Sequence, residues 1–262
     1  IVFKTSAVGI YSLYEKVSSK ILLKSHEINE WSRIEARFLK ICSLANKYNI
    51  MVLIDAEESW IQPAIDELVL KMMKTYNTKK AIVFNTIQAY RKDRYDYLNK
   101  LHKDLKGSVK IGVKLVRGAY MEKERKRAKK YNYLSPICID KSYTDEVFNK
   151  SLEYTIQNID DFGLFIGSHN EFSNRLAVDY MKLNNINKND KRIWFSQLYG
   201  MSDNISFVLA KNGYNVAKYL PFGPVSEVMP YLMRRLDENS SISSQTNREL
   251  KLISEELKRR GT

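Results

Sequence analysis

Residues 51–58, MVLIDAEE, join a wholly apolar run to a cluster of carboxylates. Short apolar runs rich in β-branched residues are typical of strands that are buried on both faces of a parallel sheet. Asp55 stands where such a strand would end, and Glu57 and Glu58 follow it closely. In a barrel of parallel strands, the active site is built at the carboxyl ends of the strands. If this pattern recurs along the chain, the apolar runs predict the strands of a parallel sheet, and the polar residues at their ends are candidates for the active site.

Six further apolar runs of this kind alternate with longer amphipathic segments. The seven strand candidates are Val2–Ala7, Met51–Asp55, Ala81–Asn85, Gly112–Val116, Leu164–Gly167, Ile193–Gln197 and Val216–Leu220. Helical periodicity occupies intervals between them, for example Glu30–Tyr48, Ala64–Tyr76 and Asp145–Asn158. Repeated strand–helix units indicate a parallel sheet with crossover helices.

Two α/β architectures fit this order, an open doubly wound sheet and a (β/α)8 barrel. No G-x-G-x-x-G follows a strand candidate, which disfavours the doubly wound dinucleotide-binding fold. Polar side chains recur instead where strands end, namely Asp55, Asn85, Gln88, Arg117, His169, Asn170 and Gln197. We therefore predict one distorted (β/α)8 TIM-type barrel domain over residues 1–262. With seven strands, it lacks its first strand, which we expect upstream of Ile1 in a longer, untruncated chain.

The composition is that of a globular protein. The chain has 262 residues, of which 44% are hydrophobic, and no run approaches the roughly 18 apolar residues that a membrane-spanning helix needs. No charged leader precedes the first strand candidate. Cys42 and Cys138 show no metal-binding spacing and are predicted to be reduced thiols. With only three histidines, we expect no metal site.

The charge balance is basic, with 43 Lys and Arg residues against 30 Asp and Glu and a formal net charge of +13. Such a balance can favour nucleic acids or anionic membranes. The densest basic run, residues 123–130 (KERKRAKK), has the spacing of a solvated helix face. No nucleic-acid recognition motif accompanies it, so we expect no nucleic-acid partner. Residues Asn247–Arg260 predict a charged helix at the end of the chain.

Two groups of ionisable side chains lie at neighbouring predicted strand ends. Lys4 lies inside the first strand, where a lysine needs a partner, and Asp55 on the next strand could supply one. A structural and a functional role for this pair are equally consistent with the sequence. Glu57 and Glu58 are explained as acidic residues at a helix amino terminus, where they interact favourably with the helix dipole.

Further candidates follow the later strands. Lys114 and Arg117 flank one strand end, and Gly118 after them would allow a ligand to approach the backbone closely. Two cations at this position suggest an anionic cofactor. His169 follows the next strand, and its position at the same rim leaves both a structural and a functional interpretation open.

The segment 219–240, YLPFGPVSEVMPYLMRRLDENS, carries a second cationic feature. Tyr231, Arg234, Arg235 and Glu238 fall at helical spacing and share one helix face. A guanidinium group matches a carboxylate in two-point geometry. This face therefore predicts a clamp for a small anionic molecule.

Taken in order, the motifs resemble those of proline dehydrogenase. They are LIDAEESWIQPAI, FNTIQAYRKDRYDYL, KLVRGAYMEKERKRA, GSHNE, FSQLYGMSDNISF and KYLPFGPVSEVMPYLMRRLDENSS. The resemblance runs from Lys4 to about Ser241. It implies a distorted (β/α)8 barrel that binds FAD noncovalently. It also implies oxidation of L-proline to Δ1-pyrroline-5-carboxylate by hydride transfer from proline C5 to flavin N5, with the electrons passed to a membrane quinone.

The resemblance further assigns roles to single residues. Asp55 and Lys114 are the implied catalytic residues, and a buried pair of Lys4 with Asp55 would lie beside the substrate. The implied substrate contacts are Lys4, Tyr120, Leu198, Tyr219, Arg234 and Arg235, with the two arginines on the proline carboxylate and the three aromatic and apolar side chains around the proline ring. The implied FAD contacts are Gln88, Lys114, Arg117, Gly118, His169 and Glu238.

Two departures and several alternatives accompany this interpretation. The family's first strand, with its acidic residue near the substrate, is not found here, and position 114 is Lys where many bacterial members have Arg. The alternatives are a hydroxyproline dehydrogenase, a phosphate-binding lyase or isomerase, and a basic binder of nucleic acid or membrane. The segment PFGP lacks the glycine-rich character of a phosphate loop.

The resemblance also suggests where the protein works. An enzyme that reduces a membrane quinone belongs in the bacterial cytoplasm at the inner membrane, or on the matrix side of the mitochondrial inner membrane. We expect any membrane contact to be peripheral, with the charged carboxyl-terminal helix as its candidate.

Overall fold

Seven parallel strands form one sheet whose spatial order is the order of the chain. This is seen in a computed structural model, which describes residues 1–226, 228–229, 231–233, 254–255 and 257–260. The strands are β1 (Val2–Lys4), β2 (Val52–Asp55), β3 (Val83–Gln88), β4 (Ile111–Val116), β5 (Phe162–Gly167), β6 (Ile193–Leu198) and β7 (Val216–Tyr219). A sequential order without a switch point excludes the doubly wound alternative.

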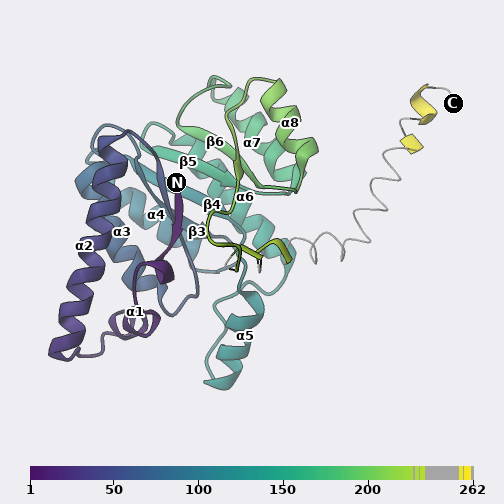
Figure 1. The fold of residues 1–262 in the computed structure, drawn as a ribbon. Coiled ribbons are helices and arrows are strands. Elements are labelled where there is room, and N and C mark those ends of the chain that lie inside the picture. Colours follow the sequence, from purple (N-terminus) through teal and green to yellow (C-terminus); the bar gives the residue numbers. More distant parts are fainter. Residues whose placement is uncertain (227, 230, 234–253, 256, 261–262) are drawn as a thin grey trace.

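The sheet curls into a partial barrel, with helices along its outer side (Figure 1). The described strands pair from β1 through to β7, and these two edge strands do not pair with each other. The expected strand ends are confirmed to within a few residues. This curled, open arrangement agrees with the expected (β/α)8 barrel that lacks one strand.

Helices connect the strands. They are α1 (Tyr11–Ser18), α2 (Ser25–Lys47), α3 (Gln62–Tyr76), α4 (Arg94–Leu105), α5 (Met121–Lys130), α6 (Lys141–Gln157), α7 (Glu171–Leu183) and α8 (Asp203–Lys211). Helix α2 begins where Glu27 accepts a hydrogen bond from the backbone N–H of Lys24, as a capping carboxylate does. Of the predicted helix Asn247–Arg260, residues 254–255 and 257–260 are described, and they are helical.

Alternation along each strand divides the side chains between two faces. Outward residues such as Ile54, Val113 and Phe195 are fully buried in one large core beneath the helices. Inward residues Leu53, Phe84 and Phe165 form a smaller apolar cluster inside the curl. Successive strand residues point to opposite faces, so the residue two positions after each of these three also points inward. These residues are Asp55, Thr86 and Gly167.

The first predicted strand, Val2–Ala7, is shorter than expected. β1 ends at Lys4, and residues Thr5–Ala7 form a 3₁₀ turn. The reason is the Glu57 carboxylate, which accepts hydrogen bonds from Thr5 Oγ1 (3.2 Å) and from the Ser6 backbone N–H (3.1 Å) and hydroxyl (2.7 Å). These bonds bend the chain away from the sheet and toward α1.

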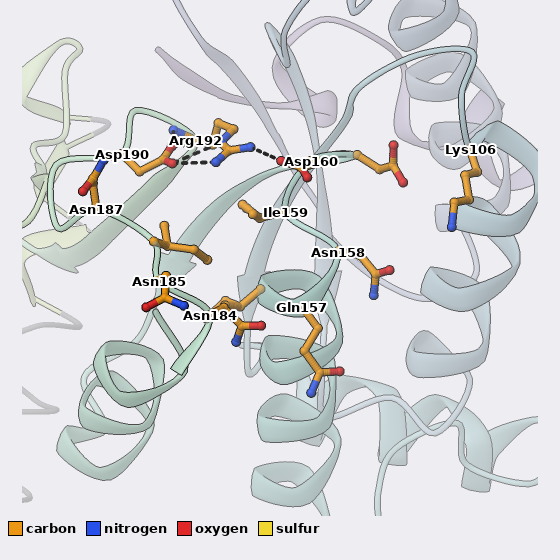
Figure 2. A pocket seen from close by; sticks show the side chains of 13 residues that line it. Lys106, Gln157, Asn158, Ile159, Asp160, Asn184, Asn185, Asn187, Asp190 and Arg192 are labelled. Atoms are coloured by element: carbon orange, nitrogen blue, oxygen red, sulfur yellow. Dashed lines mark hydrogen bonds and ion pairs between the residues drawn. The ribbon is translucent and has the colours of Figure 1, made fainter. Parts of the chain in front are cut away.

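A hollow of about 460 Å³ lies at the amino-terminal ends of β5 and β6, between the turns that precede these strands (Figure 2). Its charged side chains include Asp160, Asp161, Asp190 and Arg192. Cys42 and Cys138 are both buried as free thiols elsewhere in the fold. In the part of the chain that the structure describes, no helix is both long and apolar enough to cross a bilayer.

Candidate active site

The carboxyl ends of β1, β2 and β4 bring three charged side chains to the inner face of the sheet. Lys114 of β4 forms an ion pair with Asp55 of β2. Lys4 of β1 donates instead to the Tyr120 hydroxyl at 3.1 Å. The expected Lys4–Asp55 ion pair is therefore wrong, although the two residues are register partners on adjacent strands. Lys114 reaches Asp55 from two strands away because the curled sheet turns both side chains inward.

The electrostatics around Lys4 favour its charged form. Partial burial alone would lower the pKa of Lys4. The hydrogen bond to Tyr120 and the nearby carboxylates of Glu57 and Asp55 together outweigh burial, so the pKa of Lys4 lies above its ordinary value. Burial also raises the pKa of Tyr219, and Asp55 adds to that effect. At neutral pH this end of the sheet thus carries a protonated Lys4 and a neutral Tyr219.

The acidic residues that follow β2 serve as connectors. Glu57 holds the turn after β1, as described above, and Glu58 pairs with Lys123 of α5. The interpretation of both as helix-dipole partners is wrong, because α3 begins later, at Gln62, and has no acid in its first turn. Both carboxylates are nearly fully buried. A buried carboxylate needs several donors, and these donors come from elements distant in sequence.

Glu124 is a further buried carboxylate that the sequence did not single out. It is fully buried on α5 and accepts hydrogen bonds from Ser59, from the backbone N–H at 2.5 Å and the hydroxyl at 2.6 Å. Together with Glu58 it fastens α5 to the loop after β2. The helix begins after Tyr120, so this attachment positions the tyrosine that contacts Lys4. In the sequence, the available signal was an acidic residue within a strongly basic helical segment.

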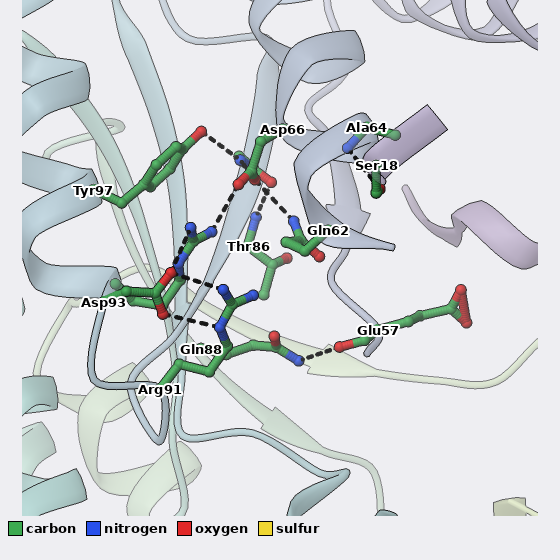
Figure 3. Close-up of polar contacts among 12 residues, drawn as sticks. Ser18, Glu57, Gln62, Ala64, Asp66, Thr86, Gln88, Arg91, Asp93 and Tyr97 are labelled. Atoms are coloured by element: carbon green, nitrogen blue, oxygen red, sulfur yellow. Dashed lines mark hydrogen bonds and ion pairs between the residues drawn. The ribbon is translucent and has the colours of Figure 1, made fainter. Parts of the chain in front are cut away.

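Gln88 at the end of β3 has a buried acceptor with no partner. Its Nε2 donates to the backbone carbonyls of Glu57 (3.0 Å) and Ala56 (3.4 Å), as Figure 3 shows for Glu57. Its Oε1 is buried and accepts no hydrogen bond from the residues that the structure describes. A buried polar atom without a partner is costly. This atom is therefore available to a donor from outside the residues that the structure describes.

A second network lies on the outer side of the same end of the sheet (Figure 3). Asp66 of α3 accepts hydrogen bonds from Gln62 Nε2 (2.9 Å), Asn85 Nδ2 (2.8 Å) and Arg94 Nη1 (2.8 Å). Arg94 also bonds to Asp93 at 3.2 Å. The predicted strand-end residue Asn85 thus faces outward and joins β3 to α3 and α4, away from the inner face.

Arg117 and Gly118 follow β4. Arg117 donates from Nε to Asp145 (2.6 Å), from Nη1 to Ser168 (2.8 Å) and from Nη2 to Ser173 (2.9 Å). These bonds hold the ends of β4 and β5 to α6 and α7. Gly118 has φ +127°, and a Cβ there would lie 2.4 Å from the Tyr90 ring. A side chain is excluded both by this backbone conformation and by that contact.

The remaining predicted residues divide between the inner face and the rim. Leu198 and Tyr219 are register partners at the ends of β6 and β7, and the Tyr219 ring lies 5.7 Å from that of Tyr231. The Nδ1 atom of His169, which follows β5, lies 3.0 Å from the Ser202 hydroxyl. Three predicted residues, Arg234, Arg235 and Glu238, lie outside the described residues.

Comparison with known proteins gives consistent matches. Residues 4–248 match the family model described as proline dehydrogenase. The chain is 36% identical over 261 residues to the carbapenem antibiotics biosynthesis protein CarD of Pectobacterium carotovorum subsp. carotovorum. This match covers 99% of this chain and 67% of that protein. It is 39% identical over 236 residues to the mitochondrial proline dehydrogenase 1 of Homo sapiens, covering 88% of this chain and 39% of that protein.

A solved structure shares the fold. Proline utilization A (PutA) from Bdellovibrio bacteriovorus, inactivated by N-propargylglycine, superposes with a TM-score of 0.80 at 23% identity. The match covers 93% of this chain and 24% of that chain. The chain therefore spans two thirds of the Pectobacterium protein and less than half of the human protein and of PutA.

Proposed function

The chain belongs to the proline dehydrogenase family, and we propose that it oxidises L-proline to Δ1-pyrroline-5-carboxylate. The observation that carries this proposal is the inner face at the carboxyl ends of the strands. Lys4, Asp55 and Lys114 meet there, next to the apolar and aromatic side chains of Leu198 and Tyr219. Charged groups against a hydrophobic wall suit a small zwitterion with an aliphatic ring.

Several residues fit FAD as the cofactor. The Oε1 of Gln88, which has no partner among the described residues, is an acceptor suited to an N–H of a flavin ring, and we also propose the backbone of Gly118 as an FAD contact. Lys114 adds a cation at the same end of the sheet, which favours an anionic reduced cofactor. When bound, the flavin supplies the acceptor for the hydride that leaves proline C5. We further propose Arg117, His169 and Glu238 as FAD contacts.

The chain's own residues would orient the substrate and control its charge. Arg234 and Arg235 are proposed to bind the proline carboxylate in two-point geometry. Tyr120, Leu198 and Tyr219 would hold the ring in one plane, because hydride transfer needs the reacting atoms at near-attack distance. The Asp55–Lys114 pair would keep a fixed carboxylate near the reacting amine without adding net charge.

The electron acceptor and the cellular location are proposed from the family alone. We propose a membrane quinone as the acceptor, with the protein in contact with the membrane surface. The names of the human and other animal relatives place those proteins in mitochondria. For this chain the proposed locations are the bacterial inner membrane, on its cytoplasmic side, or the matrix side of the mitochondrial inner membrane.

An absorption spectrum of the purified protein tests the cofactor and the substrate together. We expect a flavin band near about 450 nm that bleaches when L-proline is added without oxygen. Hydroxyproline and glycine serve as comparison substrates, because hydroxyproline tests the closest alternative activity and glycine lacks the ring. A folded protein that remains colourless after incubation with FAD would refute the proposal, as would a flavin band that proline leaves unchanged.

The roles of the two arginines are tested by substitution. Arg234→Met or Arg235→Met should weaken proline binding by about 2–4 kcal/mol, the scale for an unpaired carboxylate in a closed site. Arg175→Met on α7 is the matched control, since it removes a guanidinium from an element outside the proposed site. Flavin content should stay constant in all three variants. An unchanged Michaelis constant for proline in both site variants would contradict the assignment.

A further inference from the structure

Tyr90 is a buried residue that lies against the segment joining β4 to α5. It is 3% exposed and stands two residues after the end of β3. Its backbone is held on both sides, since its N–H donates to the Arg117 carbonyl (2.7 Å) and its carbonyl accepts a hydrogen bond from the Cys138 N–H (2.7 Å). The first of these bonds extends the pairing of β3 with β4 past the ends of both strands. The main chain therefore fixes the place of Tyr90 beside this segment.

The ring of Tyr90 packs directly against Gly118. A Cβ at position 118 would lie 2.4 Å from the ring atom Cδ1 and 2.5 Å from Cε1. Gly118 also has φ +127°, a conformation that residues with a side chain rarely adopt. The glycine thus brings the main chain onto the ring, and the ring limits how far the main chain can move at this position.

The hydroxyl of Tyr90 adds little to this contact. Its oxygen is buried and has no hydrogen-bond partner among the residues that the structure describes. Burial, and after it the nearby carboxylate of Glu124, raise the pKa of this hydroxyl, so it is a neutral phenol at neutral pH. A buried hydroxyl without a partner costs free energy. The ring, and not the hydroxyl, is therefore the useful part of this side chain.

The segment that rests on the ring carries residues of the candidate site. Gly118 is a proposed FAD contact, and the hydroxyl of Tyr120, two residues further on, accepts a hydrogen bond from Lys4 at 3.1 Å. The hydrogen bonds of Arg117 hold the start of the segment. The buried carboxylate of Glu124 holds the helix that follows. The Tyr90 ring supports the middle, between these two attachments.

We propose that Tyr90 is a positioning residue for the oxidation of proline, because its ring sets the position of the segment 117–120. It acts through Gly118 on FAD and through Tyr120 on the substrate. This inference rests on the proposed function. A shift of about 1 Å in a support of this kind can cost about 100-fold in rate, since hydride transfer depends on the alignment of the reacting atoms.

Substitution separates the ring from the hydroxyl. Tyr90→Phe keeps the ring, so the parent's kcat, KM for proline and FAD content after gel filtration should be retained, and the urea midpoint should not fall. Tyr90→Leu removes the ring, and we expect kcat/KM for proline to fall about 10- to 100-fold. The KM should rise, and less FAD should remain bound after gel filtration. FAD content is read from absorbance and needs no turnover.

A matched control is a buried tyrosine at the other end of the sheet. Tyr214 is 8% exposed, and its ring packs edge-on against Phe195 at 5.6 Å. Tyr214→Leu should lower the urea midpoint, as Tyr90→Leu does, and leave the KM and the FAD content unchanged. Equal losses of activity and FAD in this control would overturn the proposal. So would a parental KM and FAD content in Tyr90→Leu, or a loss in Tyr90→Phe as large as in Tyr90→Leu.

A change from the other side of the contact tests the coupling. The new Cβ of Gly118→Ala would meet the Tyr90 ring, so the KM should rise and the FAD content should fall, a result that does not depend on whether Tyr90→Leu folds. In Gly118→Ala/Tyr90→Leu the Cβ has more room, and the alanine should then cost less than it does in the parent background. An unchanged KM in Gly118→Ala, or simply additive losses in the double variant, would overturn the proposal. A parent protein whose flavin proline does not bleach would refute the proposed function instead, and the FAD contents would still decide this inference.

Discussion

The two ends of the sheet use the same kind of ion pair in opposite surroundings. At the carboxyl-terminal end, Arg94 pairs with Asp66 at 2.8 Å, and the side chains are only 6% and 11% exposed. At the amino-terminal end, Arg192 pairs with Asp160 at 2.6 Å, but these side chains are 42% and 92% exposed. Figure 3 shows part of the first network, with Asp66 and Asp93 labelled, and Figure 2 shows the second among the residues that line the hollow.

The difference teaches that a hollow alone does not locate the site. The amino-terminal hollow is large, but the guanidinium of Arg192 beside it already forms ion pairs with Asp190 and Asp160. Water screens such exposed pairs, so they contribute little to stability and exert weak fields. At the other end, burial makes each charge costly to leave unpaired, and the inner face has both an ion pair and an unpartnered acceptor at Gln88.

Removing the buried arginine should produce the largest effect on stability. Arg94→Met leaves Asp66 without its cation, although Asp93 keeps its ion pair with Arg91, and breaking a buried pair from one side costs about 3–5 kcal/mol. Arg192→Met at the other end should cost less than about 1 kcal/mol, because its partners are solvated. Urea denaturation measures both free energies of unfolding. Equal losses in the two variants would remove the distinction between the two ends.

The sequence predicted the sheet well because buried parallel strands leave a strong local signal. Short apolar runs such as MVLI before Asp55, separated by helical segments, indicate buried strands. The sequence could not predict which charges pair, since this depends on the curl of the sheet. Lys4 and Asp55 are neighbours in register, yet Lys114 reaches Asp55 from two strands away.

The same limit applies to the buried acids. Glu57 looked like a helix-cap residue because its neighbours in sequence were the only visible context. Its actual donors, Thr5 and Ser6, lie about fifty residues earlier in the chain. The inner-face position of Leu198 and Tyr219 came from the family resemblance, and strand alternation alone would also have given it.

The next largest effect concerns activity at the inner face. Asp55→Asn removes the carboxylate that pairs with Lys114, and we expect kcat/KM for proline to fall about 100-fold or more, the scale of one preorganised charged group in an active site. Asp160→Asn at the opposite end should leave kcat/KM unchanged. Both values are measured with an artificial electron acceptor, and flavin content is checked by absorbance. Normal activity in Asp55→Asn would place the chemistry elsewhere.

Backbone strain offers a smaller contrast between the ends. Gly118→Ala should destabilise the protein by about 2 kcal/mol, because the residue has φ +127° and its new Cβ would meet the Tyr90 ring. Gly213, which precedes β7 at the amino-terminal end, has φ +87° and nothing within 4 Å of its Cβ position. Gly213→Ala should therefore cost only about 1 kcal/mol, from the left-handed backbone alone. Thermal unfolding compares the two, and a Gly213 variant that is the less stable would contradict the contact argument.

The smallest effect is a pH dependence at the amino-terminal end. Hydrogen bonds from the Arg192 side chain lower the pKa of Asp190 below its ordinary value, which is about 3.9. A lowered carboxyl pKa contributes stability above the unfolded-state pKa, and this contribution is lost as the pH falls through the folded-state pKa. Asp190→Asn should therefore be less stable than the parent by under about 1 kcal/mol at neutral pH. The difference should shrink as the pH falls below about 3.9. Urea titrations at neutral and acidic pH measure it, and a difference that grows in acid would reverse the sign argued here.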